Sequence, residues 1–162
     1  MSSNVSDRVR RLAPPLLLAL IAGCASPIRA TLPDDFLELD GPPRELKAVT
    51  ADDARLWVRE FPDRDGGQLE FWSDSLRNDL IEQRGYEPLG EPEEITDGTG
   101  RRGIVQTYAV RHLGADQRYL IAVFVLGSGK DQRVRTAEFV APTALFDGYV
   151  DDIRTALRSL EP

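Results

Sequence analysis

The sequence predicts an α+β domain, with an antiparallel sheet of about five to seven strands and helices on both faces of the sheet. The most informative strand is 119–126, in which every residue is apolar. A strand that is apolar on both faces lies inside a sheet and has another layer on each side. Two amphipathic segments, 68–84 and 142–160, supply those layers as helices.

Strand patterns fill most of the chain between residues 36 and 140. Runs rich in β-branched, aromatic and other apolar residues alternate with turns of Gly, Pro and Asp, as in successive hairpins. In one strand Leu56 and Val58 share a face, while Trp57 and Phe61 share the other, where we expect a further layer to cover them. The predicted strands are 36–39, 46–50, 55–61, 86–89, 93–96, 104–112, 118–126 and 132–140.

Both predicted helices carry an apolar stripe at three- and four-residue steps. The first helix ends before Gly85, a residue that suits the position after a helix C-terminus. In the second, Pro142 suits the first turn, and aspartates precede arginines, as the helix dipole favours. The stripes are Leu69, Trp72, Leu76 and Leu80, and then Leu145, Phe146, Tyr149, Val150, Ile153, Leu157 and Leu160.

The N-terminus has the parts of a bacterial secretion signal. Residues 1–11 are polar and include three arginines, and residues 12–22 are apolar throughout. That apolar run is about half of the roughly 20 residues that a spanning helix needs, so it predicts a cleaved signal. Ile21-Ala22-Gly23-Cys24 follows the lipobox pattern of one aliphatic residue, two small residues and a cysteine.

This motif resembles that of bacterial lipoproteins. The resemblance implies cleavage before Cys24, a lipid on its thiol and attachment to a membrane, because several acyl chains anchor a protein stably. The alternative is cleavage after Ala25 by the ordinary signal peptidase, which would give a secreted protein. Residue 25 is not the aspartate typical of retention at the inner membrane, so the resemblance implies the outer membrane, facing the periplasm.

These predictions divide the chain into a signal peptide (1–23), a lipid-anchored tether (24–35) and a single α+β domain (36–162). Removal of the signal leaves 139 residues with 17 basic and 26 acidic side chains, a net formal charge of −9. Such an acidic balance argues against binding nucleic acid and against binding anionic lipid by charge alone. A lone cysteine excludes an internal disulfide and a cysteine-rich metal site.

Three short motifs resemble ligand-binding loops but lack the required surroundings. Residues 98–103 carry glycines at the spacing G-x-G-x-x-G, yet a strand pattern follows in place of a helix. Residues 127–130 resemble the end of a P-loop without its first glycine or its Ser or Thr. Two aspartates in residues 62–67 lack the spacing of a calcium loop. We interpret all three as turns.

No pattern in the sequence predicts a catalytic residue, a cofactor or a metal ion. The only histidine, His112, ends a strand before a turn, where we expect an exposed structural role. A glycosidase-like pair of carboxylates is left open, because the sequence does not give their separation. The acidic pairs, expected in turns or on an exposed helix face, are Asp34-Asp35, Asp52-Asp53, Glu93-Glu94 and Asp151-Asp152.

The order of elements is a hairpin, a helix, three antiparallel strands and a C-terminal helix opened by proline. Over residues 36–160 this order resembles the PsbP-like or Mog-type α/β/α fold, and bacterial DcrB-type lipoproteins are similar in placing that fold behind a lipobox. The resemblance implies a non-enzymatic envelope lipoprotein that binds or helps assemble an unknown envelope protein. Alternatives are a carbohydrate-binding or hydrolytic domain that uses the acidic pairs, and a small-ligand carrier with a cavity beneath the sheet.

Overall fold

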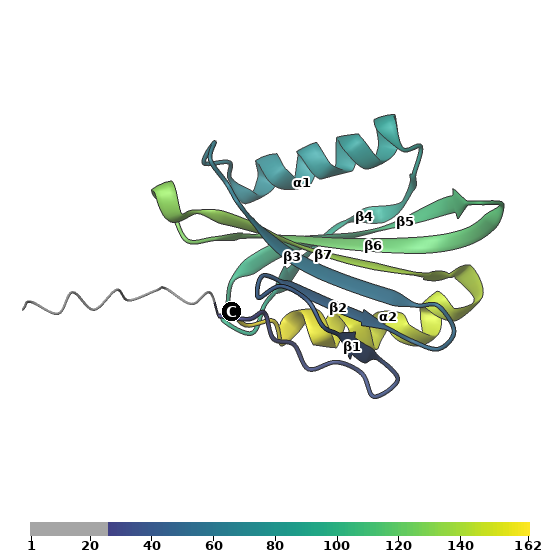
Figure 1. The fold of residues 1–162 in the computed structure, drawn as a ribbon. Coiled ribbons are helices and arrows are strands. Elements are labelled where there is room, and N and C mark those ends of the chain that lie inside the picture. Colours follow the sequence, from purple (N-terminus) through teal and green to yellow (C-terminus); the bar gives the residue numbers. More distant parts are fainter. Residues whose placement is uncertain (1–25) are drawn as a thin grey trace, which may run out of the picture.

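One seven-stranded antiparallel sheet organises residues 26–162, the part of the chain that the computed structural model describes (Figure 1). Across the sheet the order is β1-β2-β3-β7-β6-β5-β4, and each neighbouring pair is antiparallel. The strands are β1 (Leu37–Leu39), β2 (Glu45–Val49), β3 (Arg55–Pro62), β4 (Glu87–Thr96), β5 (Arg102–His112), β6 (Ala115–Leu126) and β7 (Arg133–Pro142).

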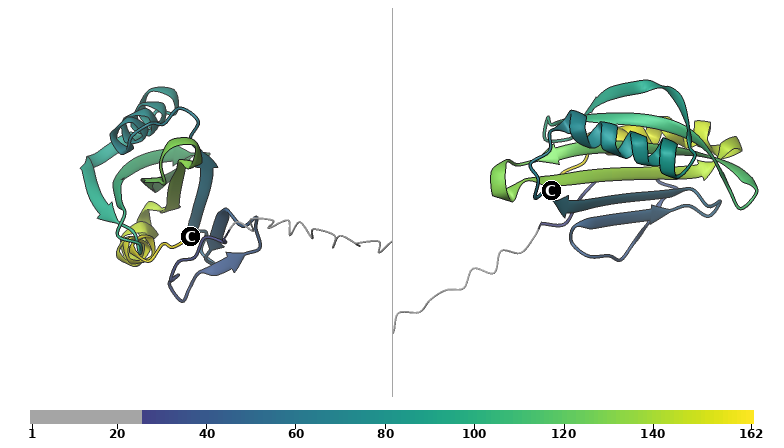
Figure 2. Two further views of the ribbon diagram at one scale, coloured as in Figure 1. Left: turned by 90° about the vertical axis from the view of Figure 1, so that its left-hand side faces the viewer. Right: turned by 90° about the horizontal axis from the view of Figure 1, so that it is seen from above.

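The two helices lie on opposite faces of this sheet, as Figures 1 and 2 show. Helix α1 (Leu69–Asn78) continues into a π-helical turn, Asp79–Gln83, and Gly85 follows with a left-handed φ of 69°. Helix α2 (Thr143–Arg158) covers the other face. The predicted fold class is therefore confirmed: residues Tyr119 to Phe124 of β6 are buried in succession, because each face of the strand meets a helix layer.

The larger core lies between the sheet and α2. Phe139 of β7 and Phe146 of α2 have ring centroids 5.3 Å apart, and Leu120, Ile153 and Leu157 are fully buried beside them. The apolar stripe predicted for the last helix faces this core. Burying such a stripe is what holds the helix on the sheet, since helical propensity alone contributes little.

The smaller core lies under α1, which contacts β5 and β6. Leu80 packs there with Tyr108, Tyr119 and Ile121. Helix α1 leaves strands β1 and β2 and most of β3 uncovered on this face, as the end-on view of Figure 2 shows. The smaller helix thus divides the face into a covered half and an open half.

Strand β4 differs from the sequence prediction of two short extended pieces. It runs continuously from Glu87 to Thr96, and a register irregularity between Leu89 and Glu93 absorbs the interruption. Gly90, with a φ of 82°, supplies the unusual backbone conformation there. The pair Glu93-Glu94 consequently lies in an edge strand and not in a turn, which corrects that expectation.

The segment before β1 also differs from the prediction, which made residues 24–35 a tether. Ile28 is only 4% exposed, and its N–H donates a hydrogen bond to the Pro43 carbonyl oxygen at 3.1 Å. Arg29 forms a β-bridge with Glu161, and Leu32 packs against the main core. Alternating apolar residues therefore bind this segment to the domain from Ile28 onward. The predicted signal peptide and Cys24 lie outside the described residues.

The β5–β6 hairpin turns more tightly than the sequence suggested. Leu113 and Gly114 form the turn with φ values of 50° and 83°, so the two strands extend to His112 and Ala115. Leu113 is 94% exposed at this tip. Within residues 26–162, no helix has both the length and the apolar character needed to cross a bilayer.

Candidate functional site

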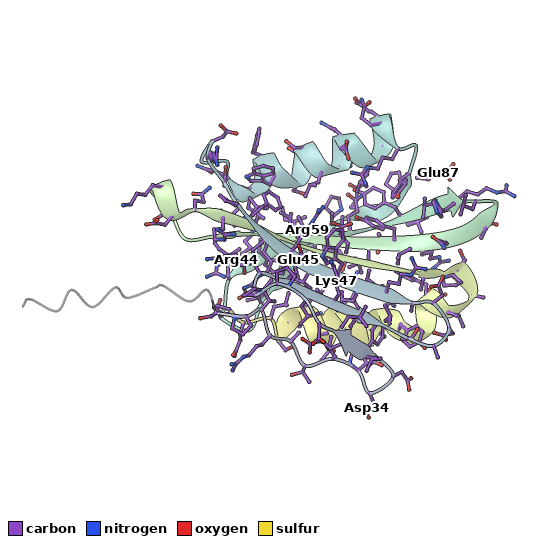
Figure 3. All side chains as sticks on the ribbon, in the orientation of Figure 1. Asp34, Arg44, Glu45, Lys47, Arg59 and Glu87 are labelled. Atoms are coloured by element: carbon purple, nitrogen blue, oxygen red, sulfur yellow. The ribbon has the colours of Figure 1, made fainter. Side chains whose placement is uncertain are left out.

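The half of the sheet that α1 leaves uncovered presents a distinct surface, which we call the open face. Side-chain alternation and the strand register place one row straight across it: Leu39 pairs with Lys47, Lys47 with Trp57, and Trp57 with Glu138. Figure 3 shows Glu45, Lys47 and Arg59 gathered where β2 meets β3. The open face consists of Leu37, Leu39, Glu45, Lys47, Trp57, Arg59 and Glu138.

Trp57 is the centre of the open face. Its ring lies 4.4 Å from the Arg59 guanidinium carbon and 5.0 Å from the Lys47 Nζ, which are cation–π distances. Its indole N–H donates to Glu45 at 3.2 Å. The expected covering layer is present for Phe61, whose ring meets Trp72 of α1 at 5.7 Å, but not for Trp57. Two cationic side chains take the place of that layer, and Trp57 remains partly exposed.

Two carboxylates hold the cations in place. Glu45 accepts a salt bridge from Lys47 at 2.8 Å, and the Lys47 hydrogen bond holds the pKa of Glu45 below its ordinary value. Glu138 accepts from Arg59 at 3.0 Å and from the Tyr119 hydroxyl at 2.8 Å. Burial raises the pKa of Tyr119 far above its ordinary value, and the Glu138 charge adds to this, so the hydroxyl stays a donor.

The open face also presents apolar surface at its edge. Leu37 and Leu39 are 68% and 41% exposed, which is unusual for leucines in a strand. Lys47 and Arg59 keep 40% and 41% of their side chains exposed beside them, so their remaining N–H groups can reach a ligand. Trp and Arg next to exposed aliphatic groups are the residue types that dominate binding energy at protein interfaces.

The aspartate loop before α1 has a structural role. The carboxylate of Asp63 is buried and accepts hydrogen bonds from the Trp72 indole N–H, the Gln132 amide and the backbone N–H groups of Asp65 and Gly66. Within residues 26–162 no three His, Cys, Asp or Glu side chains are grouped to hold a metal ion. The loop is thus a turn into α1, as interpreted from the sequence.

Most of the acidic pairs are engaged with nearby donors. Their partners are Thr50 and Tyr149 for Asp52, Arg55 for Asp53, Arg154 for Glu93 and Arg102 for Glu94.

The pairs Asp34-Asp35 and Asp151-Asp152 meet at a surface hollow of about 460 Å³, which Asp34, Asp35 and Asp152 line. All three are exposed, whereas the general acid of a glycosidase lies in apolar surroundings.

The remaining sequence motifs fall in turns and at strand ends. Residues 98–101 lie in the β4–β5 turn and Gly103 already belongs to β5, so no helix N-terminus meets the glycines. Residues 127–130 lie in the β6–β7 turn. His112 is exposed at the end of β5 and has the surface position that we predicted.

The space beneath α1 is almost filled by side chains. The space between α1 and the sheet, lined by Ser73, Leu76 and Arg77 among others, holds only about 10 Å³. Pockets for small molecules typically measure about 300–1,000 Å³. The carrier hypothesis needs a cavity beneath the sheet, and the region under α1 does not supply one.

Solved structures share this fold. LpqN of Mycobacterium tuberculosis, described as involved in cell envelope biogenesis, aligns with a TM-score of 0.66 over 88% of each chain at 17% identity. Cyanobacterial PsbP (CyanoP) of Synechocystis aligns with a TM-score of 0.54 over 91% of this chain and 99% of its own, at 13% identity.

The yeast Ran-binding protein Mog1p of Saccharomyces cerevisiae aligns with a TM-score of 0.51 over 87% of this chain and 92% of its own, at 17% identity. No protein-family model matches the chain, and no curated protein matches it in sequence. At these identities the similarity concerns the fold, and it agrees with the element order read from the sequence. This chain has the α+β fold of PsbP-like and Mog1-type proteins.

Proposed function

We propose that this protein is a lipid-anchored, non-catalytic envelope domain whose open face binds another envelope protein. The observation that carries the proposal is Trp57, held between Lys47 and Arg59 on a sheet face that no helix covers. A partly exposed tryptophan whose cationic neighbours are held by salt bridges loses little side-chain entropy on binding, which favours its use as an anchor.

The chemistry of the open face specifies the kind of partner. Leu37 and Leu39 suit an apolar side chain, while the free N–H groups of Lys47 and Arg59 suit a carboxylate beside it. Glu45 and Glu138 already neutralise the charges of Lys47 and Arg59. A partner that is only acidic therefore gains less binding free energy here than a partner that presents apolar and acidic groups together.

The lipid anchor is the second part of the proposal. It rests on the lipobox ending at Cys24 and on Ala25, which together favour attachment at the outer membrane, facing the periplasm. LpqN, which has a similar fold, is described as taking part in envelope biogenesis, and this supports an envelope role.

Site-specific photo-crosslinking tests the open face. A photoreactive amino acid at Leu39 points outward from the open face, and the same group at the neighbouring Glu38 is a matched control, because it projects to the opposite side of β1. In cells of the source organism we expect one discrete adduct from position 39 and none of that size from position 38.

The adduct should depend on the anchor residue. Trp57→Ala should weaken binding by about 30-fold or more, which is the effect of truncating a typical hot-spot residue, and should remove the adduct. Phe71→Ala, at an exposed aromatic residue of α1 on the covered half, is the control variant and should leave the adduct in place. Adducts that are equal at positions 38 and 39, or that persist in Trp57→Ala, would contradict binding through the open face.

Metabolic labelling with a fatty-acid probe tests the anchor. The parent chain should take up the label, and Cys24→Ala should take up none, because the thiol is the attachment point. The mass of the purified native protein should also show loss of residues 1–23. Equal labelling of both chains, or a bare cysteine in the native protein, would contradict lipidation.

A further inference from the structure

The tip of the β5–β6 hairpin combines an exposed apolar side chain with backbone strain. Leu113 is 94% exposed, more than any other large apolar residue of residues 26–162. Its φ of 50° lies in the left-handed region, which is unfavourable for a residue with a Cβ, and Gly114 follows with a φ of 83°. Turns of this kind usually carry Asn-Gly. Folding alone therefore favours asparagine at position 113, and an exposed leucine there points to a contact outside the chain.

A surface hollow of about 430 Å³ lies directly beside this tip. It is on the face of the sheet that carries α2, because strand alternation from the buried Val105 places Ala109 on that face. This volume is ample for a leucine side chain. The residues that line the hollow include the apolar Leu89 and Ala109 and the charged Glu87, Arg111, Asp116 and Arg118.

The charges around the hollow have both signs and are incompletely paired. Glu87 has no basic partner among the described residues, and Figure 3 shows it projecting from the sheet near this hairpin. The contact of Arg111 with Asp116 is long, at 3.7 Å, and both side chains are largely exposed. Such a surface is complementary to a second copy of itself, since Arg111 of one chain can pair with Glu87 of the other.

The positions of the tip and the hollow also favour a second copy. A projecting apolar group and a pocket at distant sites join molecules into open filaments, whereas two adjacent sites can be exchanged reciprocally about a two-fold axis. A bilayer suits the tip less well. The chain has a formal net charge of −7, and the acidic Glu87 and Asp116 lie beside the tip, so anionic headgroups would be repelled.

We infer that two copies of this protein associate through their β5–β6 hairpins, and that each copy inserts Leu113 into the hollow of the other. Burial of the leucine side chain offsets the unfavourable backbone conformation. Arg111 of each copy then faces Glu87 of the other. The contact lies on the sheet face opposite Trp57, so it leaves the open face accessible and does not depend on the proposed function.

Disulfide trapping tests this association, because a covalent bond accumulates even when the contact itself is weak. The full chain with Leu113→Cys/Leu89→Cys is treated with a mild oxidant and separated on a non-reducing gel. Leu89 pairs with Thr107, which lies about 20 Å along the hairpin from position 113. A disulfide needs Cα atoms within about 7 Å, so the bond can form only between two copies.

A second two-cysteine variant controls for random collisions. Leu113→Cys/Leu37→Cys places the second thiol at a leucine that is more exposed than Leu89 and lies at the other edge of the sheet. We expect several-fold more covalent dimer from the pair at positions 113 and 89. Peptide mapping should find the bond between these two positions, which distinguishes it from bonds to the native Cys24.

Charge reversal gives an independent readout. Within Leu113→Cys/Leu89→Cys, Glu87→Arg should lower the dimer yield several-fold, and the further change Arg111→Glu should restore it, which a loss of folding would not allow. Equal yields from positions 89 and 37, or no dimer from position 89, would overturn the association. Protection of the position 113 thiol by phosphatidylcholine vesicles, without a dimer, would also overturn it and assign the tip to a bilayer.

Discussion

Arg135→Met should lower the free energy of unfolding by about 3–5 kcal/mol, the cost of breaking a buried ion pair from one side. The substitution removes the cation that bonds Glu60 at 2.7 and 2.9 Å and that faces Asp97 at 3.6 Å. Glu60 would then depend on Arg44 and Arg133, whose contacts are longer and partly exposed to water. Urea unfolding followed by tryptophan fluorescence measures the change.

Two further variants separate charge from packing in this experiment. Glu60→Gln/Arg135→Met removes the pair together and should recover part of the lost stability, because the uncompensated charge is gone. Arg158→Met, on the exposed surface of α2, should change stability by less than about 0.5 kcal/mol. A loss below about 1 kcal/mol for Arg135→Met would show that the buried arrangement contributes little.

Asp63→Ala should lower the melting temperature by about 10 °C. The carboxylate accepts from the Trp72 indole at 2.9 Å, from Gln132 at 2.8 Å and from the N–H groups of Asp65 and Gly66, each at 3.1 Å. These bonds connect the loop, helix α1 and the start of β7, so their loss leaves several donors unpaired. Asp65→Ala, an exposed neighbour in the same loop, should change the melting temperature by no more than about 2 °C.

The contribution of Asp63 should also depend on pH. Burial disfavours its charge, but the hydrogen bonds from Trp72 and Gln132 outweigh this and hold the pKa of Asp63 below its ordinary value. Its stabilising effect is therefore present above about pH 4 and is lost as the pH falls through the lowered value. The difference in melting temperature between the parent and Asp63→Asn should shrink on acidification. A difference that is constant from neutral to acid pH would contradict this role.

The open face shows how far the sequence could predict a functional surface. Alternation along one strand correctly placed Trp57 and Phe61 on the same side, and an aromatic pair normally implies a covering layer. Phe61 has that layer and Trp57 does not, because α1 contacts β5 and β6 and reaches only the end of β3. The extent of a helix over a sheet depends on tertiary packing, so Trp57 could not be assigned as exposed from the sequence.

The buried ionic cluster of Glu60, Asp97 and Arg135 was missed for a related reason. Glu60, Asp97 and Arg135 lie on β3, in the β4–β5 turn and on β7, and no local pattern marks them as neighbours. An arginine in a strand is ordinarily expected at the surface. Its complete burial follows only once β7 pairs with β3 and the β4–β5 turn closes over the same end.

Local patterns were sufficient for the order and type of the elements. Apolar periodicity, turn residues and Pro142 act over a few positions, and the doubly apolar β6 demands a layer on each face, so the α+β fold with two covering helices followed from the chain alone. Tertiary structure decided which half of the sheet stays open, that Ile28 joins the domain, and that β4 is a single strand. These features depend on contacts between segments far apart in the sequence, whose free energies are set by packing and charge in space.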